Sequence, residues 1–284
     1  MQNFRENDME STQSRGDSPP IVLTVAGSDT SGAAGIAADL KTFAACGVHG
    51  VFALSLLTAQ NSTGIRSAQP VDSPFLQSQL AALLDDFTIV AHKTGLLFTA
   101  EAVERVVERS GGDLGARVVD PVLVRSNGES LVESDVVDRY RRDLIPTATL
   151  ITPNVAEARL LTDRTITSIS DAEDAARALG ALGPGAVVVT GVIDGDQVID
   201  VAFVDGSIEL FRHPRVETPN LLGTGCSFSA ACAAQLAKGT SILEAVDTAG
   251  RYVLDGLISA ADWRLGAGQG PIDHIARWRD GQLP

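Results

Sequence analysis

The feature that most constrains the fold is a regular alternation between short apolar stretches and longer helix-forming stretches. Each apolar stretch is rich in valine, isoleucine or leucine and ends in glycine, proline or a polar turn residue, which is typical of a buried strand. Strands are predicted over residues 21–27, 51–58, 88–93, 117–123, 148–152 and 186–190, and helices over 35–46, 73–84, 101–109, 135–144 and 171–182. Repeated strand–helix units predict an α/β fold with a mostly parallel central sheet and helices on both faces.

The pattern changes towards the C-terminal third of the chain. Turn sequences at residues 194–196 and 205–206 flank apolar stretches over 198–204 and 208–212, which predicts a small antiparallel insert. Two helices are expected after it, over residues 227–237 and 241–259. Residues 1–20 are polar and end in Ser18-Pro19-Pro20, so we expect a disordered tail there and a single domain over residues 21–284.

Helix starts can be located from capping residues. Ser134 is a candidate N-cap for the helix over 135–144, whose many charges indicate a solvated face. Asn154 is a good N-cap, and Glu157 falls at its N3 position. A capping interaction is therefore the simplest interpretation of the Asn154–Glu157 pair.

Composition limits the classes of function that the chain can have. Its 284 residues are 44% hydrophobic, which is enough for a large core, and the net charge of -14 argues against non-specific binding to nucleic acid or anionic membranes. Cys46, Cys226 and Cys232 match no disulfide framework or zinc pattern and fit a reducing cytoplasm, and the apolar stretches are too short to span a bilayer. A phosphate site must therefore be built locally.

One stretch suits such a phosphate site. Gly223-Thr224-Gly225-Cys226 opens a largely apolar run, and the first N–H groups of a helix that starts there would face an anion such as a transferring phosphoryl group. Cys226 would lie at the positive end of the helix dipole, where the pKa of a thiol is lowered. The alternative is a glycine-rich helix start with a buried cysteine.

Polar residues near the strand ends are further site candidates. The strand over 21–27 leads through a loop of small residues into the helix that carries Asp39, but the loop is neither a dinucleotide fingerprint nor a P-loop. Asp39 is either a ligand contact or a solvated side chain. Gln60 and Asn61 follow the strand over 51–58, where α/β proteins place ligand contacts, although turn formation explains Asn61 equally well.

Taken together, these motifs resemble the hydroxymethylpyrimidine and phosphomethylpyrimidine kinases of thiamine biosynthesis, which have the ribokinase-like fold. The resemblance keeps the order and spacing of the family over about residues 21–275. The matching stretches are Ala26–Asp29 with the loop Gly32–Gly35, Ala38–Phe43, Ala59–Asn61, Lys93–Gly95, Asp120–Val122, Thr152–Asn154 with Glu157–Ala158, and Gly223–Cys226.

The resemblance implies an ATP-dependent kinase that uses Mg²⁺ and acts on the hydroxymethylpyrimidine and its monophosphate. The pyrimidine is expected near Gly27, Asp39, Gln60 and Val122, and the γ-phosphate of ATP over Gly223, Thr224, Gly225 and Cys226. Cys226 would help to deprotonate the hydroxymethyl group or stabilise the transferring phosphoryl group. Glu157, with Asn154, would organise the magnesium ion through water. Relatives of this fold often form dimers, so we expect a homodimer, and the cysteine usage leads us to expect a cytoplasmic protein.

Two departures from the family pattern keep other functions open. Thr190 stands where the family usually has a lysine that contacts the ATP phosphates, and Leu222 replaces a common histidine. Loss of the lysine would weaken nucleotide binding or catalysis. The alternatives are therefore a pyridoxal kinase on the same scaffold and a non-catalytic pyrimidine-binding relative.

Overall fold

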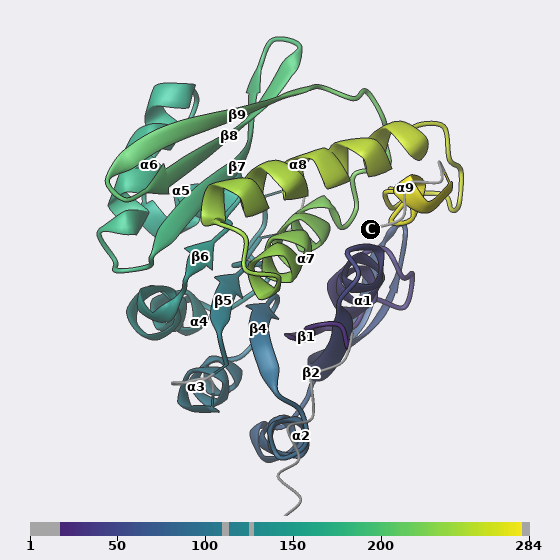
Figure 1. Cartoon of the computed structure of the whole chain (residues 1–284), viewed down its shortest axis with the longest axis vertical. Coiled ribbons are helices and arrows are strands. Elements are labelled where there is room, and N and C mark those ends of the chain that lie inside the picture. Colours follow the sequence, from purple (N-terminus) through teal and green to yellow (C-terminus); the bar gives the residue numbers. More distant parts are fainter. Residues whose placement is uncertain (1–17, 110–113, 125–127, 280–284) are drawn as a thin grey trace, which may run out of the picture.

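A computed structural model describes residues 18–109, 114–124 and 128–279, so residues 1–17 of the expected tail lie outside the described residues. The described residues form one nine-stranded sheet in the order β3-β2-β1-β4-β5-β6-β7-β8-β9 (Figure 1). Its strands are β1 (Ile21–Gly27), β2 (His49–Asn61), β3 (Gly64–Pro70), β4 (Ile89–Thr94), β5 (Ala116–Val119), β6 (Leu150–Ile151), β7 (Ala186–Asp194), β8 (Gln197–Val204) and β9 (Ser207–Pro214). Every pairing from β2 to β7 is parallel, which confirms the mostly parallel sheet.

Helices cover both faces of this sheet (Figure 1). One face carries α1 (Gly35–Ala45), α7 (Thr224–Ala237) and α8 (Ile242–Ser259), with the short α9 (Ala276–Arg279) against α8. The other carries α2 (Ser73–Leu84), α3 (Ala100–Arg109), α4 (Ser134–Arg139), α5 (Val155–Thr162) and α6 (Ile169–Gly180). Each face has its own hydrophobic core, and the apolar side chains of the parallel strands alternate between the two.

Both edges of the sheet are antiparallel. The predicted strands around Asp205-Gly206 are β8 and β9, which continue the same sheet beyond β7. At the opposite edge, β2 runs on to Asn61 and turns back into β3. The prediction that Gln60 and Asn61 lie beyond the strand was wrong, because antiparallel pairing with β3 keeps both residues extended. The polar, exposed β3 shows no apolar alternation in the sequence and was not predicted.

The helix predicted over residues 135–144 differs from its expectation. Ser134 is the first residue of α4 rather than its cap, and Glu133 occupies the N-cap position without a side-chain hydrogen bond. The segment continues through a π-helical turn over residues 140–144 and a 3-10 turn over 145–147. Its inner side is not solvated, since Val136, Tyr140 and Leu144 are buried in the core on that side of the sheet.

Capping explains where several helices begin. Asn154 accepts hydrogen bonds from the backbone N–H groups at the start of α5, and the Glu157 side chain accepts one from the Asn154 N–H, so the predicted capping interaction is confirmed. The same reciprocal arrangement opens α6 and α8. The cap of α5 fixes the loop that follows the carboxyl end of β6.

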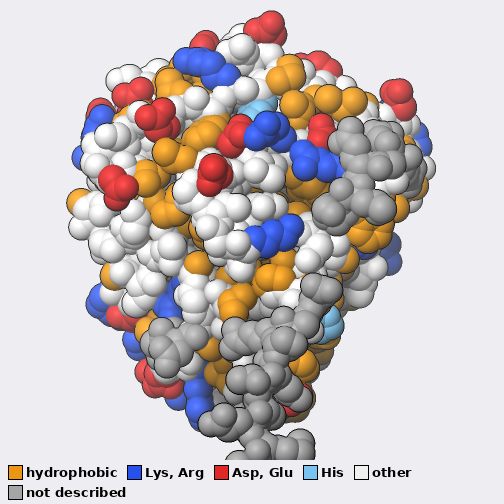
Figure 2. Space-filling model, viewed as in Figure 1, with side chains coloured by type: hydrophobic (Ala, Val, Ile, Leu, Met, Phe, Trp, Pro, Cys, Tyr) orange, Lys and Arg blue, Asp and Glu red, His pale blue; other side chains and the backbone are white. Residues whose placement is uncertain are grey.

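The sheet order reverses beside β1, which has β2 on one side and β4 on the other. Ligands of open α/β sheets bind outside the carboxyl ends of the strands at such a reversal. On the face drawn in Figure 2, acidic and basic side chains are interspersed among hydrophobic ones. No helix within the described residues is long and apolar enough to cross a membrane.

Candidate active site

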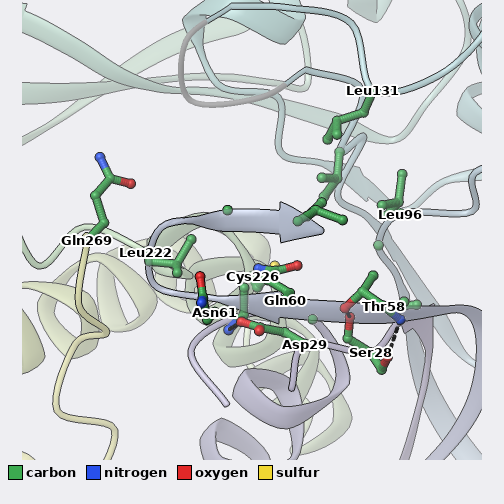
Figure 3. A pocket seen from close by; sticks show the side chains of 18 of the residues that line it. Ser28, Asp29, Thr58, Gln60, Asn61, Leu96, Leu131, Leu222, Cys226 and Gln269 are labelled. Atoms are coloured by element: carbon green, nitrogen blue, oxygen red, sulfur yellow. Dashed lines mark hydrogen bonds between the residues drawn. The ribbon is translucent and has the colours of Figure 1, made fainter. Parts of the chain in front are cut away.

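A cavity of about 650 Å³ lies at this reversal point. The residues that follow β1 and β4, the end of β2, the start of α7 and the loop at residues 268–269 all line it (Figure 3). Leu96 and Leu131 lie on one side of the cavity in Figure 3, and Asn61, Leu222 and Gln269 on the other. One side therefore offers apolar surface and the other offers amide groups, a combination that suits a small, flat, polar ring.

The residues after β1 hold the cavity wall through a loop organised by Asp29. The Asp29 carboxylate accepts hydrogen bonds from the backbone N–H groups of Ser31 (2.8 Å), Ala33 (3.2 Å) and Ala34 (2.8 Å). Gly35 begins α1 at φ +56°, and a Cβ there would lie 2.3 Å from the Gly27 carbonyl oxygen. Only glycine allows this close approach, which folds the loop back onto the end of β1.

The same loop fixes the start of α7. Gly223 is the N-cap of α7 at φ +84°, and a Cβ on it would lie 1.9 Å from the carbonyl oxygen of Ala33. By contrast, a Cβ on Gly225 would meet no atom within 4 Å. The first turn of this 14-residue helix therefore faces open space beside the cavity, and its N–H groups have the geometry that binds anions.

Cys226 lies in that first turn and lines the cavity, half-buried. The sequence predicted a lowered pKa for its thiol, and this prediction is wrong for the ligand-free protein. The pKa of Cys226 is raised to about 12, chiefly by burial; the Lys93 ammonium opposes this rise, the carboxylates of Asp120 and Asp39 add to it, and the Gly35 N–H lowers it slightly. Loss of water around the sulfur outweighs the helix terminus.

Gln60 lines the same cavity. Its backbone is fixed because the Thr30 hydroxyl accepts a hydrogen bond from the Gln60 N–H (2.9 Å) and donates one to the Gln60 carbonyl. Gly27 and Val122 also line the cavity, so three of the four residues expected at the pyrimidine lie together with Cys226.

Asp39, the fourth, is fully buried and lies outside the cavity lining. The alternative of a solvated Asp39 is therefore excluded. Its carboxylate accepts hydrogen bonds from the Lys93 ammonium (2.9 and 3.1 Å) and from the Thr24 hydroxyl (2.6 Å). Lys93 Nζ also lies 3.5 Å from Asp120 Oδ2. Burial raises the pKa of Asp39, while Lys93 and Thr24 oppose this by stabilising the charged carboxylate.

Asn154, Glu157 and Thr190, the residues expected at the nucleotide, lie where the start of α5 meets the middle of β7. Asn154 and Thr190 form a parallel bridge, and the Thr190 N–H donates to the carbonyl oxygen of Pro153 (2.9 Å). Glu157 is buried, and it forms the reciprocal capping interaction with Asn154. None of the three lines the cavity, which sets them apart from Gly27, Gln60 and Val122.

The electrostatics at Glu157 fit a hydrated magnesium ion. Burial and the nearby Asp120 carboxylate raise the pKa of Glu157 well above its ordinary value, against N–H donors from Asn154 and Leu123. The buried hydroxyl of Thr152, next to this site, has no hydrogen-bond partner. Among the described residues, no group of three or more histidine, cysteine or acidic side chains is placed to hold a metal directly. Mg²⁺ typically keeps several waters and uses one or two carboxylates plus substrate phosphates, which this set can provide.

Lys93 and Asp120 are functional candidates to which sequence reasoning assigned no role. A sequence signal did exist, because Lys93 is one of three lysines and follows an apolar strand. A lysine in that place is buried, and a buried ammonium requires a carboxylate partner. The identity of that partner, 54 residues away, required the structure.

Comparison with known proteins agrees with this geometry. The family model for phosphomethylpyrimidine kinase matches residues 29–273. The chain belongs to the phosphomethylpyrimidine kinase family. It is 43% identical over 258 residues to the hydroxymethylpyrimidine/phosphomethylpyrimidine kinase of Streptomyces coelicolor, an alignment that covers 90% of this chain and 94% of that one. The expectation of a kinase is thereby confirmed.

Solved structures of two kinds of kinase superpose on this chain. A phosphomethylpyrimidine kinase from Clostridium difficile superposes with a TM-score of 0.74 at 31% identity, covering 82% of this chain and 97% of that one. A pyridoxal kinase from Bacillus subtilis, solved as an ADP complex, gives 0.85 at 34% identity, covering 91% and 98%. Both confirm the ribokinase-like fold expected from the sequence.

Proposed function

We propose that this chain is an ATP-dependent kinase that phosphorylates 4-amino-5-hydroxymethyl-2-methylpyrimidine and then its monophosphate. The observation that carries the proposal is that Cys226, at the start of α7, lines the same cavity as Gln60. An aminopyrimidine in this cavity can therefore reach the anion-binding end of a helix. The similarity to curated hydroxymethylpyrimidine/phosphomethylpyrimidine kinases supports this choice of substrate.

The pyrimidine is bound by Gln60, Gly27 and Val122 in this proposal. The Gln60 amide has one carbonyl acceptor and two N–H donors, which complement the exocyclic amine and the ring nitrogens of an aminopyrimidine. Val122 offers apolar contact to the ring and Gly27 allows its close approach. Asp39 does not contact the pyrimidine in this proposal, because it is fully buried and lies outside the cavity lining.

The γ-phosphate of ATP lies over Gly223, Thr224, Gly225 and Cys226, at the positive end of the α7 dipole, where N–H groups of the first turn can bind it. Asn154, Glu157 and Thr190 form the nucleotide side of the site. Glu157 would hold magnesium through water, and the ion would neutralise phosphate charge when bound. The threonine at position 190 leaves phosphate binding mainly to backbone donors rather than to a lysine.

The two phosphorylations make different demands on Cys226. In the first, the hydroxymethyl oxygen bonds to the γ-phosphorus, its O–H proton leaves, and the bond from phosphorus to the leaving ADP oxygen breaks. In the second, the acceptor is a phosphate oxygen, which is largely ionised at neutral pH and has no proton to lose. A base is therefore needed only in the first step, whereas stabilisation of the transferring phosphoryl group is needed in both.

Separate turnover assays with the two pyrimidines test the proposal. If Cys226 is a base, Cys226→Ala slows phosphorylation of the alcohol by at least about 100-fold and that of the monophosphate much less. Equal losses would assign Cys226 to the phosphoryl group alone. Cys232→Ala, a buried position further along α7, is the matched control and should retain turnover. An absence of turnover with both pyrimidines in the unmodified protein would refute the proposed function.

A pyridoxal kinase is the second candidate, because the B. subtilis pyridoxal kinase superposes with the higher TM-score of 0.85. The same assay with pyridoxal decides between the two, and turnover of pyridoxal alone would transfer the assignment to vitamin B6. Gln60→Ala adds a second criterion. It should lower kcat/KM for the pyrimidine by about tenfold or more, since a hydrogen bond to the ring is lost. We also propose a cytoplasmic homodimer, which light scattering of the purified protein would test for its oligomeric state.

A further inference from the structure

A buried ammonium lies directly behind the wall of the cavity. Lys93 is completely excluded from solvent, at the carboxyl end of β4. Its Nζ is 3.1 Å from the position that a Cβ on Gly95 would occupy, and the Gly95 backbone lines the cavity. A side chain at Gly95 would crowd Lys93 and Ala26, so the ammonium lies next to a backbone segment that lines the cavity.

Two carboxylates hold the ammonium from different elements. Asp39, on α1, accepts from Lys93 through both oxygens, at 2.9 and 3.1 Å. Thr24 fixes Asp39 in turn through a 2.6 Å hydrogen bond. Asp120, which follows β5, lies 3.5 Å from the ammonium. Burial alone would lower the pKa of Lys93, but the carboxylates of Asp39 and Asp120 raise it, so the residue remains a cation.

The second carboxylate connects this cluster to the first turn of α7. The Ser229 hydroxyl lies 2.9 Å from Asp120 Oδ2 and 3.1 Å from the carbonyl oxygen of Cys226. Cys226 and Lys93 therefore lie on two elements that Asp120 bridges. Around the sulfur, the charged groups are Lys93, Asp39 and Asp120, and the Gly35 N–H is a further donor.

We propose that Lys93 is a positioning residue for Cys226. Its ammonium is the fixed counter-charge for the Cys226 thiolate, and Asp39 sets how strongly this ammonium attracts the thiolate. The inference rests on the proposed role of Cys226 in phosphoryl transfer. Asp39 neutralises much of the ammonium, and this keeps Cys226 a thiol while the cavity is empty. Removal of the Asp39 charge leaves Lys93 free to attract the thiolate, whereas removal of both charges withdraws that attraction.

Alkylation of Cys226 by iodoacetamide in the ligand-free protein tests this without turnover. The rate follows the thiolate fraction, so it rises about tenfold per pH unit below the thiol pKa and then becomes constant. Mass spectrometry resolves Cys226 from Cys46 and Cys232, which are buried and serve as internal controls for folding. The variants are Asp39→Asn and the double variant Asp39→Asn with Lys93→Met, which replaces the ion pair by neutral side chains of similar size.

In the unmodified protein the rate should rise throughout the accessible pH range. Asp39→Asn should become constant at a lower pH and react on the order of tenfold faster at neutral pH, since a carboxylate that opposes the thiolate is gone. The double variant should lose that gain. A purely structural role would increase access to the thiol in both variants alike and would not move the pH at which the rate becomes constant.

Equal pH profiles for Asp39→Asn and the double variant would overturn the proposal. If the double variant does not fold, the decision passes to Asp39→Asn and Asp120→Asn, and an unchanged profile in both would overturn it equally. Because alkylation needs neither ATP nor pyrimidine, its outcome is independent of whether the chain is a pyrimidine kinase.

Discussion

Two glycines in the same short motif should respond in opposite ways to one added methyl group. Gly223 has φ +84°, and a Cβ there would lie 1.9 Å from the backbone oxygen of Ala33. Gly225, two residues later, has no atom within 4 Å of its Cβ position. Gly223→Ala therefore perturbs the packing of α7 against the loop before α1, while Gly225→Ala leaves that packing intact.

The cost of Gly223→Ala follows from these values. An alanine at a left-handed φ costs about 1–2 kcal/mol. Relief of the clash requires Ala33 O to move from 1.9 Å to at least 3.4 Å from the new carbon, and the atom belongs to the backbone, so no side-chain rotation can relieve it. With about 2–4 °C per kcal/mol in a domain of this size, the left-handed φ alone should lower Tm by at least about 2 °C, and the clash should add to this fall. A shift of about 1 Å at the catalytic turn can cost about 100-fold in turnover.

Thermal denaturation and ATP turnover, measured side by side on both variants, check this reasoning. Gly225→Ala should fold with an unchanged or slightly higher Tm, because alanine favours the helix by up to about 1 kcal/mol. Its turnover should still fall, since the added methyl group occupies the space proposed for the γ-phosphate. A Gly223→Ala protein with normal Tm and normal turnover would refute the steric argument, and a fully active Gly225→Ala would place the phosphate elsewhere.

Two further predictions concern buried polar groups. Tyr140 donates a 2.8 Å hydrogen bond to the carbonyl of Gly95 in the cavity wall, so Tyr140→Phe should lower the free energy of unfolding by about 1–2 kcal/mol in urea titrations. Burial lowers the pKa of His92 and of His274 to about 4, so both are neutral in the fold but gain a proton below pH 6.5 once unfolded. This contribution to the free energy of unfolding is fully present above about pH 6.5 and is lost as pH falls towards 4. The free energy of unfolding should fall by about 2 kcal/mol per histidine between pH 7 and pH 5. Equal free energies of unfolding at these two pH values would contradict the argument.

The order of strands and helices was predictable because its signals are local. Apolar runs ending in glycine or proline mark the parallel strands, and the Asn154–Glu157 pair marks the start of α5. The strand β3 was missed because it lies at an exposed edge, where neither face needs an apolar pattern. The partly buried face of α4 was missed for a related reason, since charged residues there mask the buried Val136 and Tyr140.

The site was predictable as a set of positions but not as an electrostatic system. The sequence identified Cys226 from its glycine-rich surroundings, and the helix that begins at Thr224 has the predicted form. The pKa of the thiol was predicted in the wrong direction, because burial dominates it and because the charged groups around it, Lys93, Asp120 and Asp39, come from distant parts of the chain. Such contributions depend on three-dimensional packing, and no local motif encodes them.

The charges around the cavity explain how an acidic chain can bind phosphates. Asp39 and Asp120 are buried beside the Lys93 ammonium and Glu157 is buried near Asp120, so carboxylates outnumber the ammonium in this cluster. Glu157 relieves the excess by a raised pKa and Cys226 by remaining a thiol. A cation bound with the nucleotide would offset the excess negative charge that Glu157 and Cys226 otherwise relieve in these two ways. In the proposed function, attraction for the nucleotide would come from this cluster through a bound cation and from the start of α7, so a threonine in place of a lysine at position 190 is consistent with this balance.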